Sequence, residues 1–518
     1  MSYSPAMKTS AFVLAAALAG CAQVATQPST PAPDDAAHIT ARYFDSIRES
    51  PPQLGAFLRA MPKGADLHNH LSGAIWAEDF LEWAARDGDC VDRATSKLIA
   101  PPCDAAQGRP PVAAAFRDDR LYRQLVDAWS MRDFVAASGE SGHDHFFDTF
   151  GRFHLVSSAH RGDMLARAAH QAAQDNVLYL ELMDTLADSP IRGLVKNVSW
   201  DGDFAHAHEQ LQPGMATVLA TAKDELDAAR RRMREDLRCD SAQADAGCKV
   251  EVRYLYQVLR GLAPAQVFAQ LLTGFELASS DPRVVGLNMV MPEDGRVSMR
   301  DYRLQMAMLD YLHGRFPDVA ISLHAGELSP TMVPPDGLRF HIRAAIEQGH
   351  ARRIGHGVDV MHEDDPHGLL REMAAGHVLV EICPTSNRSI LGIGGADHPL
   401  PVYLAAGVPL AIATDDEGVS RSNLSREFAI AAGSWNLSYA TLKTMARNSL
   451  EYAFVAGPSL WVAPDKHEPV GACAHEAAGA QTPGARCAKF LAGSEKARLQ
   501  WQLEGEFRRF EDAVAAGR

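Results

Sequence analysis

The sequence lacks an excess of positive charge and lacks any Cys-x-x-Cys pair. Its 50 Lys and Arg residues against 65 Asp and Glu residues give a formal net charge of −15. A nucleic-acid partner is therefore disfavoured, because phosphate backbones are held mainly by Lys and Arg. None of the eight cysteines forms a Cys-x-x-Cys pair, which excludes a zinc finger. We also find no internal repeat, and we expect a small, uncharged or weakly charged ligand.

Long apolar runs are also missing, and the one near the start, Ala11 to Leu18, is too short to span a membrane as a mature helix. Leu18-Ala19-Gly20-Cys21 follows it, which resembles a bacterial lipoprotein signal. We therefore expect residues 1–20 to be a signal peptide, Cys21 to carry lipid and residues 21–40 to be a flexible tether. The protein would then be lipid-anchored in the bacterial cell envelope, at the periplasmic or outer-membrane face. An ordinary secretory signal with a chance cysteine is the alternative.

Six further cysteines fall into close pairs within polar or Gly/Pro-containing stretches. Crosslinks at such places would pin insertion loops in an oxidising compartment. Spacing alone leaves 15 arrangements of six cysteines. We predict the three local disulfides Cys90–Cys103, Cys239–Cys248 and Cys473–Cys487, with Cys383 as a buried free thiol.

Short, nearly continuously apolar runs alternate with helical stretches after residue 60. Parallel strands buried on both faces show this pattern. The runs are Gly64 to His70, Val177 to Met183, Lys249 to Val258, Val284 to Val290, Asp318 to His324, Arg352 to His356, His377 to Ile382 and Val408 to Thr414. Eight such runs predict an α/β fold, a (β/α)₈ TIM barrel. An open doubly wound sheet is the alternative, but it would concentrate its chemistry at one switch point.

We expect residues 41–518 to form one domain with helical insertions after the first and second strands. The insertions span residues 77–175 and 189–247. The first would roof the barrel mouth, where loops often shape the substrate pocket. A loop and helix extension over residues 458–518 would close the chain.

His68 and His70 end the first predicted strand. Residues two apart on a strand point to the same face, so both imidazoles can enter the barrel and share one metal ion. Groups at the ends of later strands would join them at the same barrel mouth. We expect one Zn²⁺ per chain, which lowers the pKa of bound water to about 7. Its predicted ligands are His68, His70, His324 and the catalytically important Asp415.

Glu327 and His356 are the candidate proton-transfer groups. Glu327 lies three residues beyond His324, and in a closed pocket it could stay protonated and donate to a heterocyclic nitrogen. Its alternative role is to cap a following helix. His356, between two glycines, could orient the attacking water and accept its proton, or else be a core histidine.

Two further polar segments contain candidate metal or substrate contacts. Asp415 and Asp416 would point in opposite directions on a strand, so that one binds metal while the other accepts a hydrogen bond from substrate. His143-Asp144-His145 could form an additional metal site. Because it lies in a connecting segment before Phe146 and Phe147, we expect a helix start or a pocket rim instead.

Several motifs resemble those of adenosine deaminases, in the family's order and spacing from about residue 60 to about residue 430. They are Met61-Pro62-Lys63, His68-Asn69-His70-Leu71-Ser72-Gly73, Ser322-Leu323-His324-Ala325-Gly326-Glu327, Ile354-Gly355-His356-Gly357, Cys383-Pro384-Thr385-Ser386-Asn387 and Thr414-Asp415-Asp416. The continuation Glu417 to Ser422, the secretion signal and the long first insertion look most similar to the exported branch, the adenosine deaminase growth factors.

The resemblance implies a zinc TIM barrel that hydrolyses adenosine, and 2'-deoxyadenosine, to inosine and ammonia. It makes His68, His70, His324 and Asp415 the zinc ligands. Glu327 would protonate the purine at N1, His356 would assist water attack at C6, and Asp416 would share a hydrogen bond at N7. The partner is then a purine nucleoside, and contact with a membrane is limited to the lipid anchor.

The sequence departs from the family at two positions that concern the substrate. Ser72 stands where deaminases usually carry the Asp that meets ribose, and a hydroxyl offers hydrogen bonds without charge. Met291 lies in a segment that usually contains Gly beside the purine edge, and its side chain would reshape the pocket floor. Another 6-aminopurine derivative is therefore an alternative substrate.

Two other functions are alternatives. A nucleoside-binding lipoprotein without catalysis would not need Glu327 and His356 together. A different amidohydrolase reaction, on an amide or ester, would be favoured by a second metal held by a modified Lys, and the fourth predicted strand contains no Lys.

Overall fold

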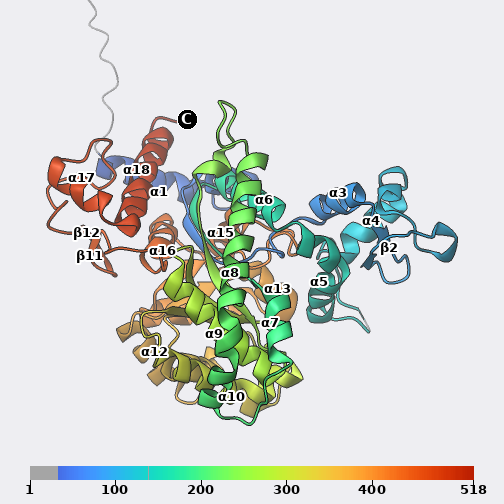
Figure 1. The fold of residues 1–518 in the computed structure, drawn as a ribbon. Helices are drawn as coiled ribbons and strands as arrows, with labels where there is room; N and C mark the ends of the chain where they lie inside the picture. Colours follow the sequence, from blue (N-terminus) through green and yellow to red (C-terminus); the bar gives the residue numbers. More distant parts are fainter. Residues whose placement is uncertain (1–32, 138, 518) are drawn as a thin grey trace, which may run out of the picture.

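The computed structural model describes residues 33–137 and 139–517 (Figure 1). The predicted signal peptide and the lipidation site Cys21 lie outside the described residues. Helix α1 (Pro33–Ile47) begins inside the predicted tether, so that prediction is wrong for residues 33–40. The helix forms because Ala36, Thr40 and Phe44 make one buried face, which packs near the C-terminal helix α18 (Glu495–Ala515).

Eight parallel strands follow one another around the sheet in chain order. They are β1 (Gly64–His70), β4 (Val177–Asp184), β5 (Glu251–Leu259), β6 (Val284–Val290), β7 (Ala320–Ala325), β8 (Arg353–His356), β9 (Leu379–Ile382) and β10 (Leu410–Ile412). A parallel bridge between Asn69 and Asp415 joins the segment after β10 to β1, and Asp415 N donates to His68 O at 2.8 Å. The predicted TIM-barrel fold is confirmed.

Helices cover the outside of the sheet. They are α2 (Pro51–Ala60), α6 (Arg161–Gln174), α9 (Pro264–Ser280), α10 (Arg296–His313), α11 (His341–Glu347), α12 (Pro366–Ala375), α13 (Pro384–Leu391), α14 (Leu400–Ala406), α15 (Leu424–Ser434) and α16 (Tyr439–Glu451). Short 3₁₀ helices lie at Ala105–Gln107, Val112–Arg117, Ala246–Lys249, Pro335–Leu338, Val360–His362 and Gly395–Asp397. Each side chain at a strand end is thereby held on a scaffold packed from outside.

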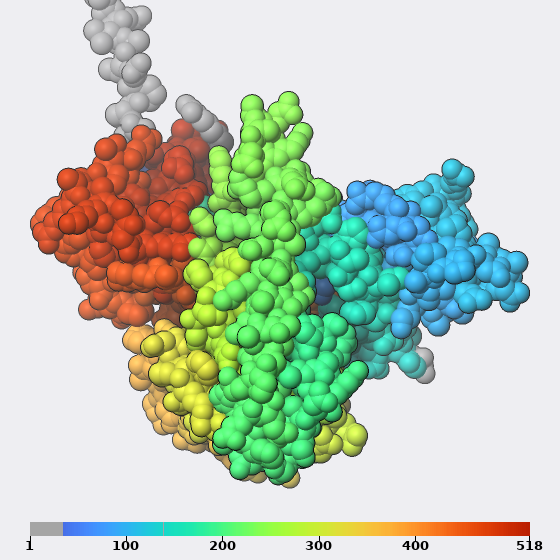
Figure 2. All heavy atoms as spheres, viewed as in Figure 1, coloured from blue at the N-terminus to red at the C-terminus, as the bar shows by residue number. Residues whose placement is uncertain are grey.

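The first insertion forms a lobe beside the barrel, which projects on the right of Figures 1 and 2. It contains α3 (Ala77–Asp87), β2 (Cys90–Val91), β3 (Leu98–Ile99), α4 (Asp119–Ala128) and α5 (Gly142–Ala159). The second insertion contains α7 (Asp188–Val195) and the long helix α8 (Phe204–Asp236), which packs on α6 and α9. The C-terminal extension adds β11 (Trp461–Ala463), β12 (Lys466–Pro469) and α17 (Ala485–Ala492).

All three predicted disulfides are present, Cys90–Cys103, Cys239–Cys248 and Cys473–Cys487. Each one closes a loop within an insertion or within the C-terminal extension. Cys383 is free and buried, as predicted. No helix in the described part of the chain is long and apolar enough to cross a membrane.

Candidate metal and catalytic site

The predicted site residues meet at the carboxyl ends of the barrel strands. His68 and His70 belong to β1, His324 to β7 and His356 to β8, while Asp415 follows β10 directly across from β1. Their side chains are buried, and only that of His70 is as much as 12% exposed. Parallel strands of one barrel bring residues that are 347 positions apart, His68 and Asp415, into the same mouth.

The imidazole nitrogens and one carboxylate converge on a common point. His68 Nε2 lies 3.1 Å from His324 Nε2 and 3.5 Å from Asp415 Oδ1, and His70 Nε2 lies 3.2 Å from that oxygen. Asp415 Oδ1 has no hydrogen-bond partner. Buried imidazoles that face one another and an unpartnered carboxylate oxygen are the donor set of a zinc site. The residues present therefore fit a Zn²⁺ ion.

Two overlapping groups of side chains could hold the ion, and Asp415 belongs to both. In each group the ligand atoms lie within 4.8 Å of one another. One group is His68, His324, His356 and Asp415; the other is His70, Asp415 and Asp416. All four predicted ligands are thus brought together, and their assignment as the metal ligands stays a prediction.

Each predicted histidine ligand is held from behind through its Nδ1 atom. Glu381 Oε2 lies 2.8 Å from Nδ1 of His68, Gln257 Oε1 lies 2.9 Å from Nδ1 of His70, and Asn288 Oδ1 lies 2.8 Å from Nδ1 of His324. Such partners select the tautomer that leaves Nε2 free to bind metal. Sequence reasoning missed all three. The available signal was a polar residue inside each mostly apolar strand.

Buried charges inside the barrel support Glu381. Arg353 Nε donates to Glu381 Oε1 at 2.6 Å, and the other end of its guanidinium contacts Glu181 at 2.6 Å. Burial alone would raise the pKa of Glu381, but Arg353 and His68 hold it below its ordinary value. A carboxylate therefore faces His68.

Glu327 is buried beside His356, with its Oε1 3.6 Å from His356 Nε2. Burial, together with the charges of Asp415 and Glu293, raises the pKa of Glu327 well above its ordinary value. This shift favours the protonated form of the acid. It caps no helix in the described residues, because the segment after β7 stays irregular up to Pro335. Glu293 accepts from the backbone N–H groups of Gly326 and Glu327, at 3.1 and 2.8 Å, and so holds this segment.

His356 and Asp415 adopt left-handed backbone conformations, with φ of 73° and 60°. Non-glycine residues rarely do so, and such strain collects at functional sites. The third such residue at the mouth is Met291, with φ of 84° and a side chain that is 38% exposed. Its side chain lies near Gly261. The sequence predicts that this residue reshapes the floor of the pocket, and the structure places it at the edge of the barrel mouth.

The predicted substrate contacts Asp416 and Ser72 lie beside the metal ligands. Burial raises the pKa of Asp416 to about 8, and its Oδ1 has no hydrogen-bond partner. Ser72 is half-buried in the turn after β1. Their roles in substrate binding stay predictions.

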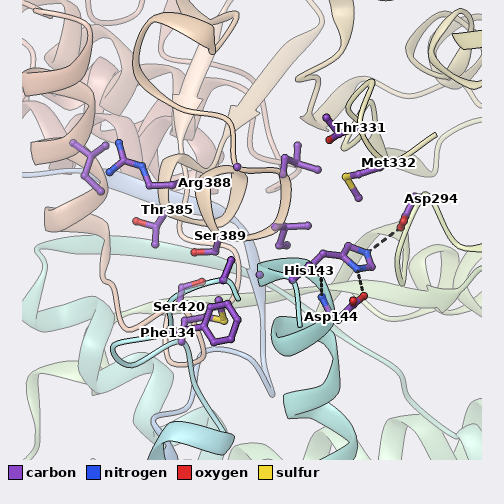
Figure 3. A pocket seen from close by; sticks show the side chains of 18 of the residues that line it. Phe134, His143, Asp144, Asp294, Thr331, Met332, Thr385, Arg388, Ser389 and Ser420 are labelled. Carbon is purple, nitrogen blue, oxygen red and sulfur yellow. Dashed lines mark hydrogen bonds and ion pairs between the residues drawn. The ribbon is translucent and has the colours of Figure 1, made fainter. Parts of the chain in front are cut away.

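A cavity of about 720 Å³ lies over the ends of the strands, between the first insertion and the barrel (Figure 3). Its lining includes Phe134, His143, Asp294, Thr331, Thr385 and Ser420. His143 bridges Asp144 and Asp294, at 3.0 Å from each. The triplet that begins at His143 therefore starts α5 and forms the pocket rim, as expected, and it belongs to neither group of potential metal ligands found among the described residues.

Comparisons with known proteins find similarity to purine deaminases. Residues 210–459 match the family model of adenosine deaminase. An adenine deaminase of Chelativorans sp. (strain BNC1) is 30% identical over 214 residues, which cover 41% of this chain and 60% of the relative. An adenosine deaminase of Shewanella loihica is 36% identical over 139 residues, 27% of this chain and 39% of the relative. The chain thus spans about three fifths or less of these curated relatives.

Among solved structures, the apo N6-methyl-AMP deaminase of Arabidopsis thaliana has a TM-score of 0.50 and 20% identity, and the match covers 78% of this chain and 94% of that chain. This likeness concerns the fold alone. The family model, which matches a little under half of the chain, and the curated relatives show that the chain is similar to adenosine and adenine deaminases.

Proposed function

We propose that the protein is a zinc-dependent deaminase that converts adenosine, and 2'-deoxyadenosine, to inosine and ammonia. The observation that carries this proposal is the buried carboxyl of Glu327, whose pKa is raised and whose Oε1 lies 3.6 Å from His356 Nε2, at the same barrel mouth as the four predicted ligands. A zinc ion in that position would activate water for attack on the ring carbon. An acid, a histidine and a metal site in one closed pocket are the parts that hydrolytic deamination requires.

Three residues of the chain would have distinct roles in the reaction. Glu327 donates its proton to a ring nitrogen, which makes the neighbouring carbon more electrophilic. The Glu293 contacts keep the backbone of Glu327 in place while that proton moves. Asp416, with its unpartnered oxygen and raised pKa, can share a hydrogen bond with a second ring nitrogen.

The cavity supports a nucleoside in preference to a free base. Its lining contains none of the predicted metal ligands or proton-transfer groups, but it adjoins the site through Ser420, whose backbone N–H donates to Asp416 O at 2.8 Å, and its volume of about 720 Å³ would leave room for a sugar. Hydroxyl and carboxyl groups on its lining, such as Thr331 and Asp294, suit a hydroxylated ligand. Adenine is the second candidate, because a curated relative is an adenine deaminase.

A direct assay tests the proposal. Zinc-loaded protein is offered adenosine, 2'-deoxyadenosine and adenine, and both ammonia and the ultraviolet absorbance change are measured. We expect turnover of the two nucleosides to exceed that of adenine. Glu327→Gln should lower kcat by about 100-fold or more while zinc content stays equal. Absence of ammonia from every substrate, or near-normal turnover by the variant, would contradict the proposal.

We further propose that the protein belongs to the exported branch and is anchored to the cell envelope through lipid on Cys21. Three disulfides in surface segments support an oxidising location. Labelling cells with a radioactive fatty acid should mark the wild-type protein. Label that persists on Cys21→Ala would dismiss the anchor.

A further inference from the structure

A chain of three hydrogen bonds ends on Nδ1 of His356. Leu400 N lies 3.1 Å from His398 Nδ1, His398 Nε2 lies 3.1 Å from Asn387 Oδ1, and Asn387 Nδ2 lies 2.9 Å from His356 Nδ1. His356, Asn387 and His398 are at most 2% exposed. With almost no contact to solvent, each group depends on its neighbours for its hydrogen bonds.

The direction of every bond in this chain follows from its first donor. A backbone N–H can only donate, so His398 Nδ1 must accept. Burial lowers the pKa of His398 to about 4, so the ring is neutral and carries its one proton on Nε2. That N–H donates to the oxygen of Asn387, which turns the amide NH₂ toward His356. Nδ1 of His356 must therefore accept, and the proton of its ring lies on Nε2.

We propose that Asn387 and His398 are positioning residues that hold His356 with its proton on Nε2, so that His356 meets the substrate as a hydrogen-bond donor. The proposal rests on the deaminase function proposed above and refines it. From the sequence we expected His356 to accept a proton from water instead. An imidazole whose Nδ1 accepts from Asn387 and whose Nε2 carries a proton has no free lone pair for that task.

The geometry around Nε2 agrees with a donor that waits for a ligand. His356 Nε2 has no hydrogen-bond partner in the protein. It lies 3.6 Å from Glu327 Oε1 and 4.0 Å from Asp415 Oδ2. Its N–H thus faces the space between the acid and the predicted metal ligand, where it can donate to the attacking oxygen.

The same reasoning separates His356 from the three predicted histidine ligands. Their Nδ1 atoms face the acceptors of Glu381, Gln257 and Asn288, which leaves each Nε2 lone pair free. The Asn288 oxygen is identified independently, because it also accepts from the backbone N–H of His324 at 3.1 Å. Nδ1 of His356 faces a donor. The partners behind the rings thus assign three imidazoles to the metal and exclude the fourth, although all four lie close together.

Nitrogen NMR of zinc-loaded, full-length protein labelled with ¹⁵N-histidine reads the tautomer directly. Comparison with the spectrum of His356→Gln identifies the His356 signals. We expect a protonated Nε2 and an unprotonated Nδ1. A proton on Nδ1 with a bare Nε2, or protons on both nitrogens, would overturn the proposal. This measurement needs no turnover, so it can fail or succeed independently of the deaminase assay.

Asn387→Asp tests the consequence for catalysis. A carboxylate accepts only, so His356 would have to move its proton to Nδ1 and present a lone pair from Nε2. We expect that shift in the ¹⁵N spectrum and a fall in kcat of about 100-fold or more at equal zinc content, since the wrong tautomer of a catalytic histidine costs about 10⁴-fold in a serine protease. Retention of the wild-type tautomer, or a kcat within a factor of about two, would count against the proposal.

Asn448→Asp is the matched control. Asn448 is also a buried amide, but it lies on α16 and donates to Leu410 O at the start of β10, away from the site. Its substitution should lower thermal stability with little change in kcat. If Asn387→Asp fails to fold, the wild-type spectrum alone decides between the two tautomers.

Discussion

Asp416 lies directly against Gly73, so closely that a Cβ atom on residue 73 would be 1.5 Å from Asp416 Oδ1. The carbonyl of Gly73 also accepts from the backbone N–H groups of Gly418 and Val419, at 2.9 and 3.0 Å. The turn after β1 and the turn after β10 are therefore joined by backbone hydrogen bonds. A glycine is required at this position because of close approach.

Gly73→Ala should displace the Asp416 carboxylate from its place in the pocket. We expect kcat/KM for adenosine to fall by about tenfold or more, in line with the loss of one strong hydrogen bond to substrate. Zinc content should stay equal, as measured by metal analysis. Gly55→Ala in α2 is the control, since nothing lies within 4 Å of its added methyl group. Equal kcat/KM in the two variants would show that Gly73 has no role in substrate binding.

Met291→Gly should change stability little, because relief of backbone strain offsets the chain freedom that glycine adds to the unfolded state. The left-handed backbone at φ of 84° costs a residue with a Cβ atom about 1 kcal/mol, and glycine avoids this cost. Little packing is lost, because the Met291 side chain is 38% exposed. The measurement is the free energy of unfolding in urea.

Met361→Gly is the control in which no backbone strain is relieved. Met361 is 41% exposed and is not among the residues with positive φ. Glycine there should destabilise by about 0.5–1 kcal/mol, because it adds only chain freedom to the unfolded state. A loss of stability in Met291→Gly would show that side-chain contacts outweigh the backbone strain.

Much of the barrel could be predicted from the sequence, because short apolar runs between turns have few alternatives. The bounds of β1 and β6 agree residue for residue with the predicted strands. β10 is shorter than the predicted run Val408 to Thr414 and ends at Ile412, since the chain turns into the left-handed conformation at Asp415. The metal-ligand motifs could be found because they follow strands, where the barrel collects its chemistry.

Contacts between distant residues could not be predicted. Glu381 lies 313 residues from His68, and nothing local to either residue indicates the pair. Asn387 belongs to a motif that carried the family resemblance, yet its role depends on His398, which no motif contains. Helix α1 was expected to be tether because its partner α18 lies at the other end of the chain.

Removal of the metal should abolish activity and lower thermal stability together. His68 Nε2 and His324 Nε2 face each other at 3.1 Å near the buried, unpartnered Asp415 Oδ1, and a bound cation would satisfy these three atoms. Dialysis against a chelator should therefore lower the melting temperature, and one equivalent of zinc should restore both properties. Glu327→Gln should regain the melting temperature without regaining activity. A melting temperature that does not change when zinc is removed or added would contradict the predicted metal ligands.

The buried carboxyl of Glu427 should make stability depend on pH. It accepts from Thr385 N at 2.8 Å, from Thr385 Oγ1 at 2.5 Å and from the Ser422 hydroxyl, yet burial raises its pKa to about 7 from the ordinary 4.5. Between these two values the folded chain binds more protons than the unfolded chain. Stability supplied by this group is therefore complete at low pH and falls as pH rises from about 4.5 through about 7.

Glu427→Gln removes this titration. Relative to the variant, the wild type should lose up to about 3 kcal/mol of unfolding free energy across that range, since one pKa unit corresponds to about 1.4 kcal/mol. Urea unfolding at a series of pH values measures the difference. Glu209→Gln, at an exposed position on α8, alters no buried contact. Its unfolding free energy should therefore depend on pH in the same way as that of the wild type. Parallel curves for Glu427→Gln and the wild type would mean that Glu427 remains ionised in the folded chain, held by its three donors.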